Sequence, residues 1–150
     1  MRKAFSILTA IFIIVLMATV AAFILNLSGK MVKGTTAQFQ KEQSMLLAKS
    51  YTEYAIMAVT ANEHNSTNCL NEIAGTYGND GTGNPLYTID VDIYYIGDAN
   101  LDGSCNTLSN GVITEKSPLS IIVDVFVSFP ILDHPDGLNK TYHRRSLQKI

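Results

Sequence analysis

Residues 98–104, DANLDGS, have the composition and spacing of the first half of a calcium-binding loop. Oxygen-bearing groups recur at alternate positions, namely Asp98, Asn100, Asp102 and the backbone carbonyl of Ser104. Gly103 permits the sharp turn of such loops, but the twelfth position, where a bidentate Glu is usual, is Ser109. The spacing makes calcium a candidate cofactor, and an ordinary turn between two strands is the alternative.

The chain has two cysteines, Cys69 and Cys105, both in polar, turn-rich sequence. This context favours a disulfide formed in an oxidising compartment. Closing a loop of about 37 residues would stabilise the fold by roughly 4 kcal/mol in the chain-entropy model. Free structural thiols and a metal-binding pair are the alternatives.

The remaining polar candidates predict surface positions rather than catalysis. His64, His134 and His143 are scattered without ligand spacing, so we expect exposed or hydrogen-bonded side chains. Asn65 opens an N-x-[ST] acceptor, with Glu63 two positions before it as in the extended bacterial glycosylation sequence. Turn composition explains the same residues equally simply, so Asn65 is only a candidate glycosylation site.

No nucleophile elbow, phosphate loop or pair of catalytic carboxylates is visible, and we expect no enzyme activity. Asp90 and Asp92 alternate on a predicted strand, which is typical of a solvated face. The net charge of −2 and the absence of a basic stripe give no indication of nucleic-acid binding.

The elements that position these residues begin with an apolar run from Ala4 to Gly29 that has no charged residue. At about 1.5 Å per residue it is long enough to cross a hydrocarbon core of about 30 Å as a helix. The leader residues Arg2 and Lys3 favour a cytoplasmic N-terminus. Lysines just beyond the run (Lys30, Lys33 and Lys41) weigh against that orientation, whereas the two cysteines favour a domain outside the cytoplasm.

The helical pattern continues beyond the apolar run. From Thr35 to about Glu63 the sequence has no Pro or Gly and becomes amphipathic. One face carries Leu47, Tyr51, Tyr54 and Ala58, and the opposite face carries Glu42, Lys49 and Glu53. We therefore predict one helix from about residue 5 to about residue 63, with Gly29 and Gly34 as its weak points. Met45 and Ile56 project near the charged face, either as scattered surface residues or as contacts to a neighbouring subunit.

The start of the chain, Arg2-Lys3-Ala4 followed by Phe5, resembles the class III leader of type IV pilins and type II secretion pseudopilins. The resemblance implies cleavage after Ala4 by a prepilin peptidase, N-methylation of Phe5, and retention of the whole apolar helix. It covers roughly residues 1 to 60 and implies a small sheet packed on the outer half of the helix. A secretory signal cleaved after Ala22 is the competing interpretation, but the apolar run continues past that point.

The sequence departs from the family at two positions. Thr9 stands where these subunits usually carry a Glu that pairs with a neighbour's N-terminal amine, and a hydroxyl is a weaker partner for an ammonium. This absence resembles the minor subunit at a filament tip. Asn26 stands where many pilins have Pro, so no sharp kink is expected there.

The rest of the chain predicts a small antiparallel sheet. A short helical turn over Cys69 to Ala74 and a loop over Thr76 to Pro85 precede the first strand. Strands are expected at Leu86 to Ile96, Leu119 to Phe129 and Lys140 to Ile150, and their alternation predicts one apolar face that needs a cover. The predicted class is α+β, a long N-terminal helix packed on about three strands. The predicted division is 1–4 leader, 5–28 transmembrane half, 29–63 amphipathic half and 64–150 sheet domain.

These features lead to two hypotheses of different classes. The first is a minor pilin-like or pseudopilin-like subunit of a type IV pilus or type II secretion filament. The resemblance implies a bacterial inner-membrane location with a cytoplasmic N-terminus and a periplasmic or surface domain. It implies other pilin-like subunits, the prepilin peptidase, an inner-membrane assembly platform and membrane lipid as partners. The second is a single-pass, membrane-anchored binding module with a calcium-ordered loop.

Overall fold

The computed structural model describes residues 2–62, 68–97, 105–109, 111, 119–131 and 138–150, with side chains from Ile7 onward. The chain divides into two compact units, Met1–Phe39 and Gln40–Ile150. The described part of the first unit is helical, and the second combines the end of that helix with a five-stranded sheet. The predicted α+β class is confirmed.

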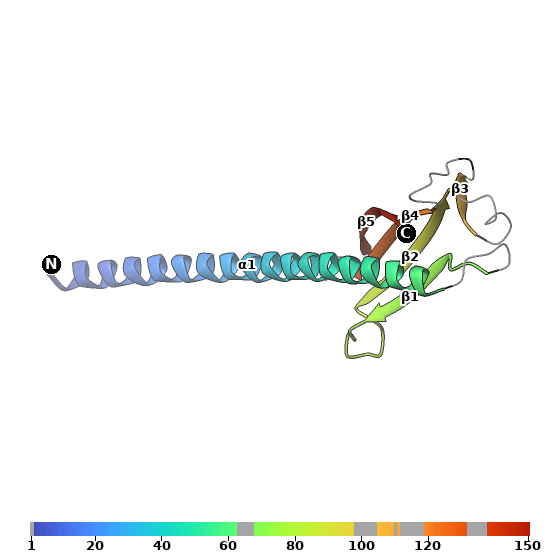
Figure 1. The fold of residues 1–150 in the computed structure, drawn as a ribbon. Helices are drawn as coiled ribbons and strands as arrows, with labels where there is room; N and C mark the ends of the chain where they lie inside the picture. Colours follow the sequence, from blue (N-terminus) through green and yellow to red (C-terminus); the bar gives the residue numbers. More distant parts are fainter. Residues whose placement is uncertain (1, 63–67, 98–104, 110, 112–118, 132–137) are drawn as a thin grey trace. The chain divides into compact units, whose positions relative to one another are not determined.

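Helix α1 spans Arg2–Ala61, sixty residues in one element (Figure 1). These bounds lie close to the predicted ones. Gly29 and Gly34 are both helical, and a Cβ added at either would meet nothing within 4 Å. The helix ends where the Asn62 N–H donates to the carbonyl of Val59 at 3.1 Å, within two residues of the predicted end.

The sheet has a main path of four antiparallel strands and one short parallel addition. The path runs in the order β1 (Glu72–Tyr77), β2 (Tyr87–Ile96), β4 (Ser120–Pro130) and β5 (Asn139–Lys149). Strand β3 (Thr107–Ser109) pairs with β2 in parallel, on the same side of β2 as β1. The three predicted strands correspond to β2, β4 and β5, each within one residue at either end.

Two strands were not predicted. The helical turn expected over Cys69 to Ala74 is wrong, because Glu72–Tyr77 is β1 and its last two residues lie in the stretch predicted as loop. Its sequence, EIAGTY, contains Ala and Gly, which are poor strand formers by themselves. Pairing with a complete neighbouring strand decides its conformation.

The two faces of the sheet differ sharply. The inner face, toward α1, carries side chains such as Ile89, Val91, Val123 and Val125, all at most 1% exposed. The outer face carries the alternate residues, among them Asp90, Asp92 and Asp124. Burial of the apolar inner face at roughly 25 cal/mol per Å² is the main force that holds α1 to the sheet.

The helix face that covers the sheet differs from the predicted one. The fully buried apolar positions are the small residues Ala48, Ala55 and Val59, whereas Tyr54 is 52% exposed and Ala58 only half-buried. Larger residues such as Leu47 and Tyr51 are only half-buried and pack against this core. The prediction chose the larger residues and so placed the face about one residue out of phase.

Met45 and Ile56 differ in their exposure to solvent. Met45 is 38% exposed, as expected of a surface position. Ile56 packs against the core and is half-buried, so the expectation that this domain leaves it in water is wrong.

Gly75 in β1 makes room for Tyr51 of α1. A Cβ at Gly75 would overlap the Tyr51 hydroxyl and lie 2.7 Å from Cζ and 2.8 Å from Cε1 of the ring. A side chain at position 75 is therefore incompatible with the observed packing of Tyr51.

We expect Gly75→Ala to lower the free energy of unfolding by about 1–3 kcal/mol, the usual cost of overpacking. The measurement is chemical denaturation of the full chain in detergent. In a Tyr51→Leu background the same substitution should cost clearly less, because the overlapping ring is gone. An equal cost in both backgrounds would contradict the proposed contact.

Candidate functional site

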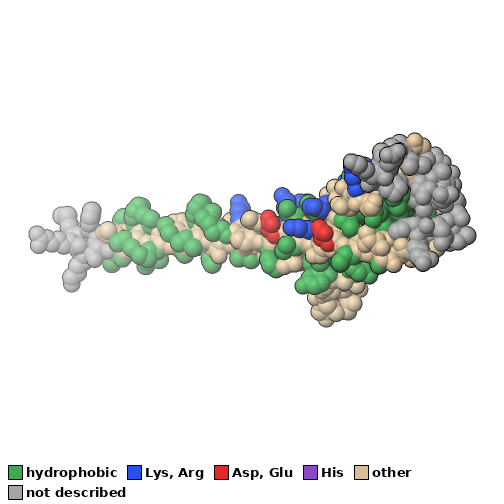
Figure 2. Space-filling view, in the orientation of Figure 1, with side chains coloured by type: hydrophobic (Ala, Val, Ile, Leu, Met, Phe, Trp, Pro, Cys, Tyr) green, Lys and Arg blue, Asp and Glu red, His purple; other side chains and the backbone are tan. Residues whose placement is uncertain are grey.

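The first candidate site is the apolar surface of α1. Every described residue from Ile7 to Thr35 is exposed, including large apolar side chains such as Leu8 at 73% and Leu25 at 74%. On the face drawn in Figure 2, hydrophobic side chains follow one another along this part of the helix. By length and composition α1 is able to cross a membrane, and none of its most apolar stretch is buried by the protein itself.

The hydroxyl of Thr19 inside this surface is satisfied locally. Its Oγ1 donates to the carbonyl of Leu16 at 2.8 Å, so no partner outside the helix is needed. Thr9, at the predicted assembly position, is exposed, and α1 continues through Asn26 without a break. The backbone of Ala4 and Phe5 belongs to α1, but their side chains lie outside the described residues.

Several predicted positions cannot be placed. The calcium-loop residues Asp98, Asn100, Asp102 and Ser104 lie outside the described part of the chain, as does Asn65. His64 and His134 lie outside it too. Within the described residues, no three His, Cys, Asp or Glu side chains are grouped so that they could hold a metal ion.

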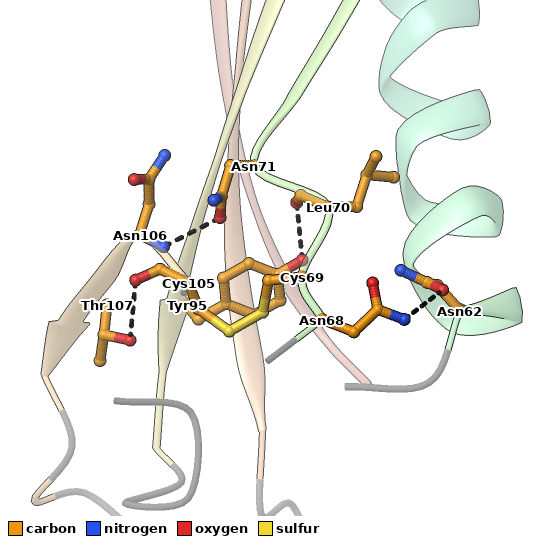
Figure 3. Close-up of a disulfide and its surroundings, with 9 residues drawn as sticks. All are labelled: Asn62, Asn68, Cys69, Leu70, Asn71, Tyr95, Cys105, Asn106 and Thr107. Atoms are coloured by element: carbon orange, nitrogen blue, oxygen red, sulfur yellow. Dashed lines mark hydrogen bonds between the residues drawn. A yellow bond between two sulfur atoms is a disulfide. The ribbon is translucent and has the colours of Figure 1, made fainter. Parts of the chain in front are cut away.

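The predicted disulfide is present. Cys69 and Cys105 are bonded with their Cα atoms 5.2 Å apart, across 36 positions of sequence. Figure 3 shows the bond beside Tyr95, whose hydroxyl donates to the carbonyl of Leu70 at 2.7 Å. Burial raises the pKa of the Tyr95 phenol above its ordinary value, which keeps this donor protonated at neutral pH.

Asn71 ties the same region together. Its side-chain oxygen accepts from the Asn106 N–H at 2.9 Å (Figure 3). Its backbone carbonyl accepts from the Ile93 N–H at 2.8 Å. The segment after α1 is thereby fixed to both β2 and the approach to β3.

The outer face of the sheet holds a charged cluster centred on Asp124. This carboxylate is only 2% exposed, and Arg145 grips it through Nε at 2.7 Å and Nη2 at 2.6 Å. Nε2 of His143 lies 2.9 Å from the same carboxylate, and its ring stacks on Phe126 with centroids 4.5 Å apart. The hydrogen bonds from Arg145 hold the pKa of Asp124 below its ordinary value, although burial acts in the opposite direction.

No motif in the sequence pointed to this cluster. An Asp inside the apolar strand β4 was one signal, but its partners depend on the register between β4 and β5. That register places Asp124 opposite Arg145. Asp90, by contrast, is exposed as predicted, and Asp92 is half-exposed.

A groove lies between α1 and the edge strand β1. It has a volume of about 380 Å³ and is lined by Ser50, Tyr51, Tyr54, Ile73 and Ala74. Two tyrosine rings, two apolar residues and the side chain of Ser50 border this groove.

The chain matches no model of a known protein family, no curated protein and no solved structure.

Replacing both cysteines, Cys69→Ala with Cys105→Ala, should lower the free energy of unfolding by about 4 kcal/mol, because the unfolded chain regains the entropy of a 36-position loop. Denaturation of the full chain in detergent measures it. Adding reductant to the wild-type protein should produce a loss of the same order, while the double variant should not respond. A wild-type protein indifferent to reductant would show that the bond does not stabilise the fold.

Acid should destabilise the fold through Asp124. Its pKa is lower in the folded state than in the unfolded state, so this stabilisation is complete above the unfolded pKa of about 3.9 and is lost as pH falls through the folded value. Between about pH 5 and about pH 3, Asp124→Asn should therefore lose less stability than wild type. Asp90→Asn, an exposed position on the same face, is the control and should behave like wild type. Equal acid sensitivity in wild type and Asp124→Asn would contradict the assignment.

Proposed function

We propose that this chain is a minor pilin-like subunit of a type IV pilus or type II secretion filament. In this proposal the precursor is trimmed after Ala4, and the mature chain begins at Phe5 and assembles through its N-terminal helix. The domain formed by residues 40–150 would then lie on the surface of the filament or its tip.

The observation that carries the proposal is the difference in burial between the two parts of α1. Its apolar residues from Ile7 to Leu27 are exposed, whereas its last part, from Gln40, packs on the sheet. A cleavable secretory signal has no physical need to belong to the same helix as a core-forming segment. A subunit that first sits in lipid and then packs among like helices needs this arrangement, because lipid and neighbouring helices both cover apolar side chains.

The coarser conclusion about location stands on the helix itself. One helix that is long and apolar enough to cross a bilayer is consistent with single-pass anchoring. The bacterial inner membrane, the cytoplasmic N-terminus and the periplasmic side of the sheet domain belong to the proposal. The disulfide supports an oxidising compartment for that domain.

Thr9 supports the assignment to a minor subunit. A carboxylate at this position in low dielectric would bind a neighbour's N-terminal ammonium strongly, and the threonine hydroxyl offers a weaker bond. A subunit without the carboxylate is poorly suited to repeat along a shaft through that N-terminal pairing, and a place at the tip does not require it. The peptidase, the assembly platform and the neighbouring subunits are separate proteins in this proposal.

The second function considered from the sequence, a membrane-anchored module with a calcium-ordered loop, gains no support from the described residues, because its loop lies outside them. It serves as an outcome of the test.

The test is the intact mass of the mature protein from its native membrane. We expect loss of the first four residues and gain of one methyl group. Ala4→Leu should leave the precursor uncut, because a large residue replaces the small one before the predicted cleavage point. Ala22→Leu, the matched control at the other candidate junction, should be processed normally.

Two results would overturn the proposal. A mature chain that starts at Met1 would indicate a simple anchored module. A chain that starts at Phe23, with processing blocked by Ala22→Leu and not by Ala4→Leu, would indicate a secreted protein.

A further inference from the structure

We propose that the free edge of β1 pairs with the free edge of β5 in a second copy of this chain, so that the antiparallel sheet continues from one copy to the next. This inference goes beyond the proposed function and does not depend on where the chain is processed.

Both end strands offer backbone groups that the described chain leaves unpaired. The hydrogen bond from Ile93 to Asn71 fixes the alternation between β1 and β2. The N–H and C=O groups of Glu72, Ala74 and Thr76 therefore point away from β2, along the open edge. The same alternation, carried through β4, turns the corresponding groups of Thr141, His143 and Arg145 outward from β5.

The number of strands on the main path makes these two edges compatible. Its four strands alternate in direction, so β1 and β5 run opposite ways, and two copies in the same orientation bring them together antiparallel. The residues with free backbone groups carry outer-face side chains on both edges. Joining the edges therefore keeps the inner faces of both copies on one side, with α1 covering each. With an odd number of strands, the two edge strands would run in the same direction. The residues with free backbone groups would then also lie on opposite faces at the two edges.

The register within one copy predicts the register between copies. Glu72, Asp92, Asp124 and Arg145 form one row across the outer face. Continuing this row places Arg145 of the second copy beside Glu72, which gives an opposite-charge pair across the new edge. The next rows place His143 of the second copy opposite Ala74, which is too small to obstruct the ring, and Thr141 opposite Thr76.

The row that contains Thr76 already has a hydroxyl–hydroxyl contact within one copy. It contains Thr76, Thr88, Ser128 and Thr141, and the hydroxyls of Ser128 and Thr141 lie 2.9 Å apart. Thr141 of the second copy would add one more hydroxyl pair to this ladder.

The inner face supplies an argument of a different kind. In the same register Arg144 of the second copy lies opposite Ile73, one of the residues that line the groove beside β1. Tyr51 and Tyr54 border that groove, and aromatic faces attract a guanidinium. Among the residues that the structure describes, Nε of Arg144 is buried without a hydrogen-bond partner, which is a costly condition.

Strand β1 also lacks the usual devices that prevent edge pairing. Its six residue pairs with β2 are regular, with no proline and no bulge, and its only charge is Glu72. Its exposed centre, at Ala74 and Thr76, is small and uncharged. Both positions are exposed and therefore open to a second strand.

The test is disulfide crosslinking between two full-length copies co-expressed in the same membrane with different tags. One copy carries Thr76→Cys and the other Thr141→Cys, and mild oxidation should join them because opposed strand residues lie within disulfide reach. Thr88→Cys is the matched control, since Thr88 lies in the same row and on the same face but one strand further in. Thr88→Cys with Thr141→Cys should give no such product.

Two further variants test the chemistry of the edge. Ala74→Pro removes an N–H that points away from β2, so it should abolish the crosslink and leave the β1–β2 ladder intact. Glu72→Lys leaves the backbone unchanged and places a lysine beside Arg145 of the second copy. The repulsion between the two positive charges should also cause loss of the crosslinked product. This variant keeps the test decisive if the proline variant does not fold. The crosslink should persist in the uncleaved Ala4→Leu background, which separates this inference from the proposed function.

Absence of the Thr76–Thr141 product would overturn the inference. Equal crosslinking of Thr88→Cys, or a crosslink that survives both Ala74→Pro and Glu72→Lys, would overturn it as well.

Discussion

The side chains that α1 exposes between Ile7 and Leu27 are mostly apolar, and their contact with water is unfavourable. This constraint requires an apolar environment around that part of the helix. Full burial of each large apolar side chain is worth about 1.5–3 kcal/mol, so the fourteen that are exposed here together outweigh any single polar contact in the described part of the chain. The helix satisfies its own backbone hydrogen bonds, and Thr19 hides its hydroxyl on the Leu16 carbonyl. What remains for a partner to supply is apolar contact, from lipid or from other helices.

The other unit solves the same problem internally. Its helix segment covers the inner face of the sheet with Ala48, Ala55 and Val59, and large side chains from β2 and β4 fill the space between. Because the buried helix residues are small, the β-branched residues of the strands provide most of the volume of the core. The disulfide and the hydrogen bonds of Tyr95 and Asn71 then hold the chain where it leaves the helix.

The outer face follows a different rule. Asp124 is buried, yet it is acceptable there because Arg145 and His143 satisfy its oxygens. The same face carries Glu72, Asp90 and Asp92 toward β1 and His143, Arg145 and Lys149 on β5. In the proposed pairing, this separation of charge across the four strands of the main path makes the two edges complementary.

Periodicity was sufficient for much of the architecture. The apolar run predicted the exposed part of α1, the absence of Pro and Gly after Thr35 predicted its length, and alternation predicted β2, β4 and β5. It failed for β1, whose residues Ala74 and Gly75 have no strand preference of their own. It also failed for the buried face of the helix, because a hydrophobic pattern ranks Tyr54 above Ala48 and cannot register how closely a helix approaches a sheet.

The sequence by itself determined the long helix, three of the strands, the stretch that is able to cross a membrane, and the pairing of the two cysteines. These properties are local, or depend on a choice with a single answer, since only two cysteines exist. Only the tertiary structure decided that Asp124 meets Arg145, that Tyr51 lies over Gly75, and that β1 and β5 form the two edges of the sheet. Strand order and register bring together residues far apart in the chain, and a shift of one residue would exchange the faces of a strand and undo these contacts.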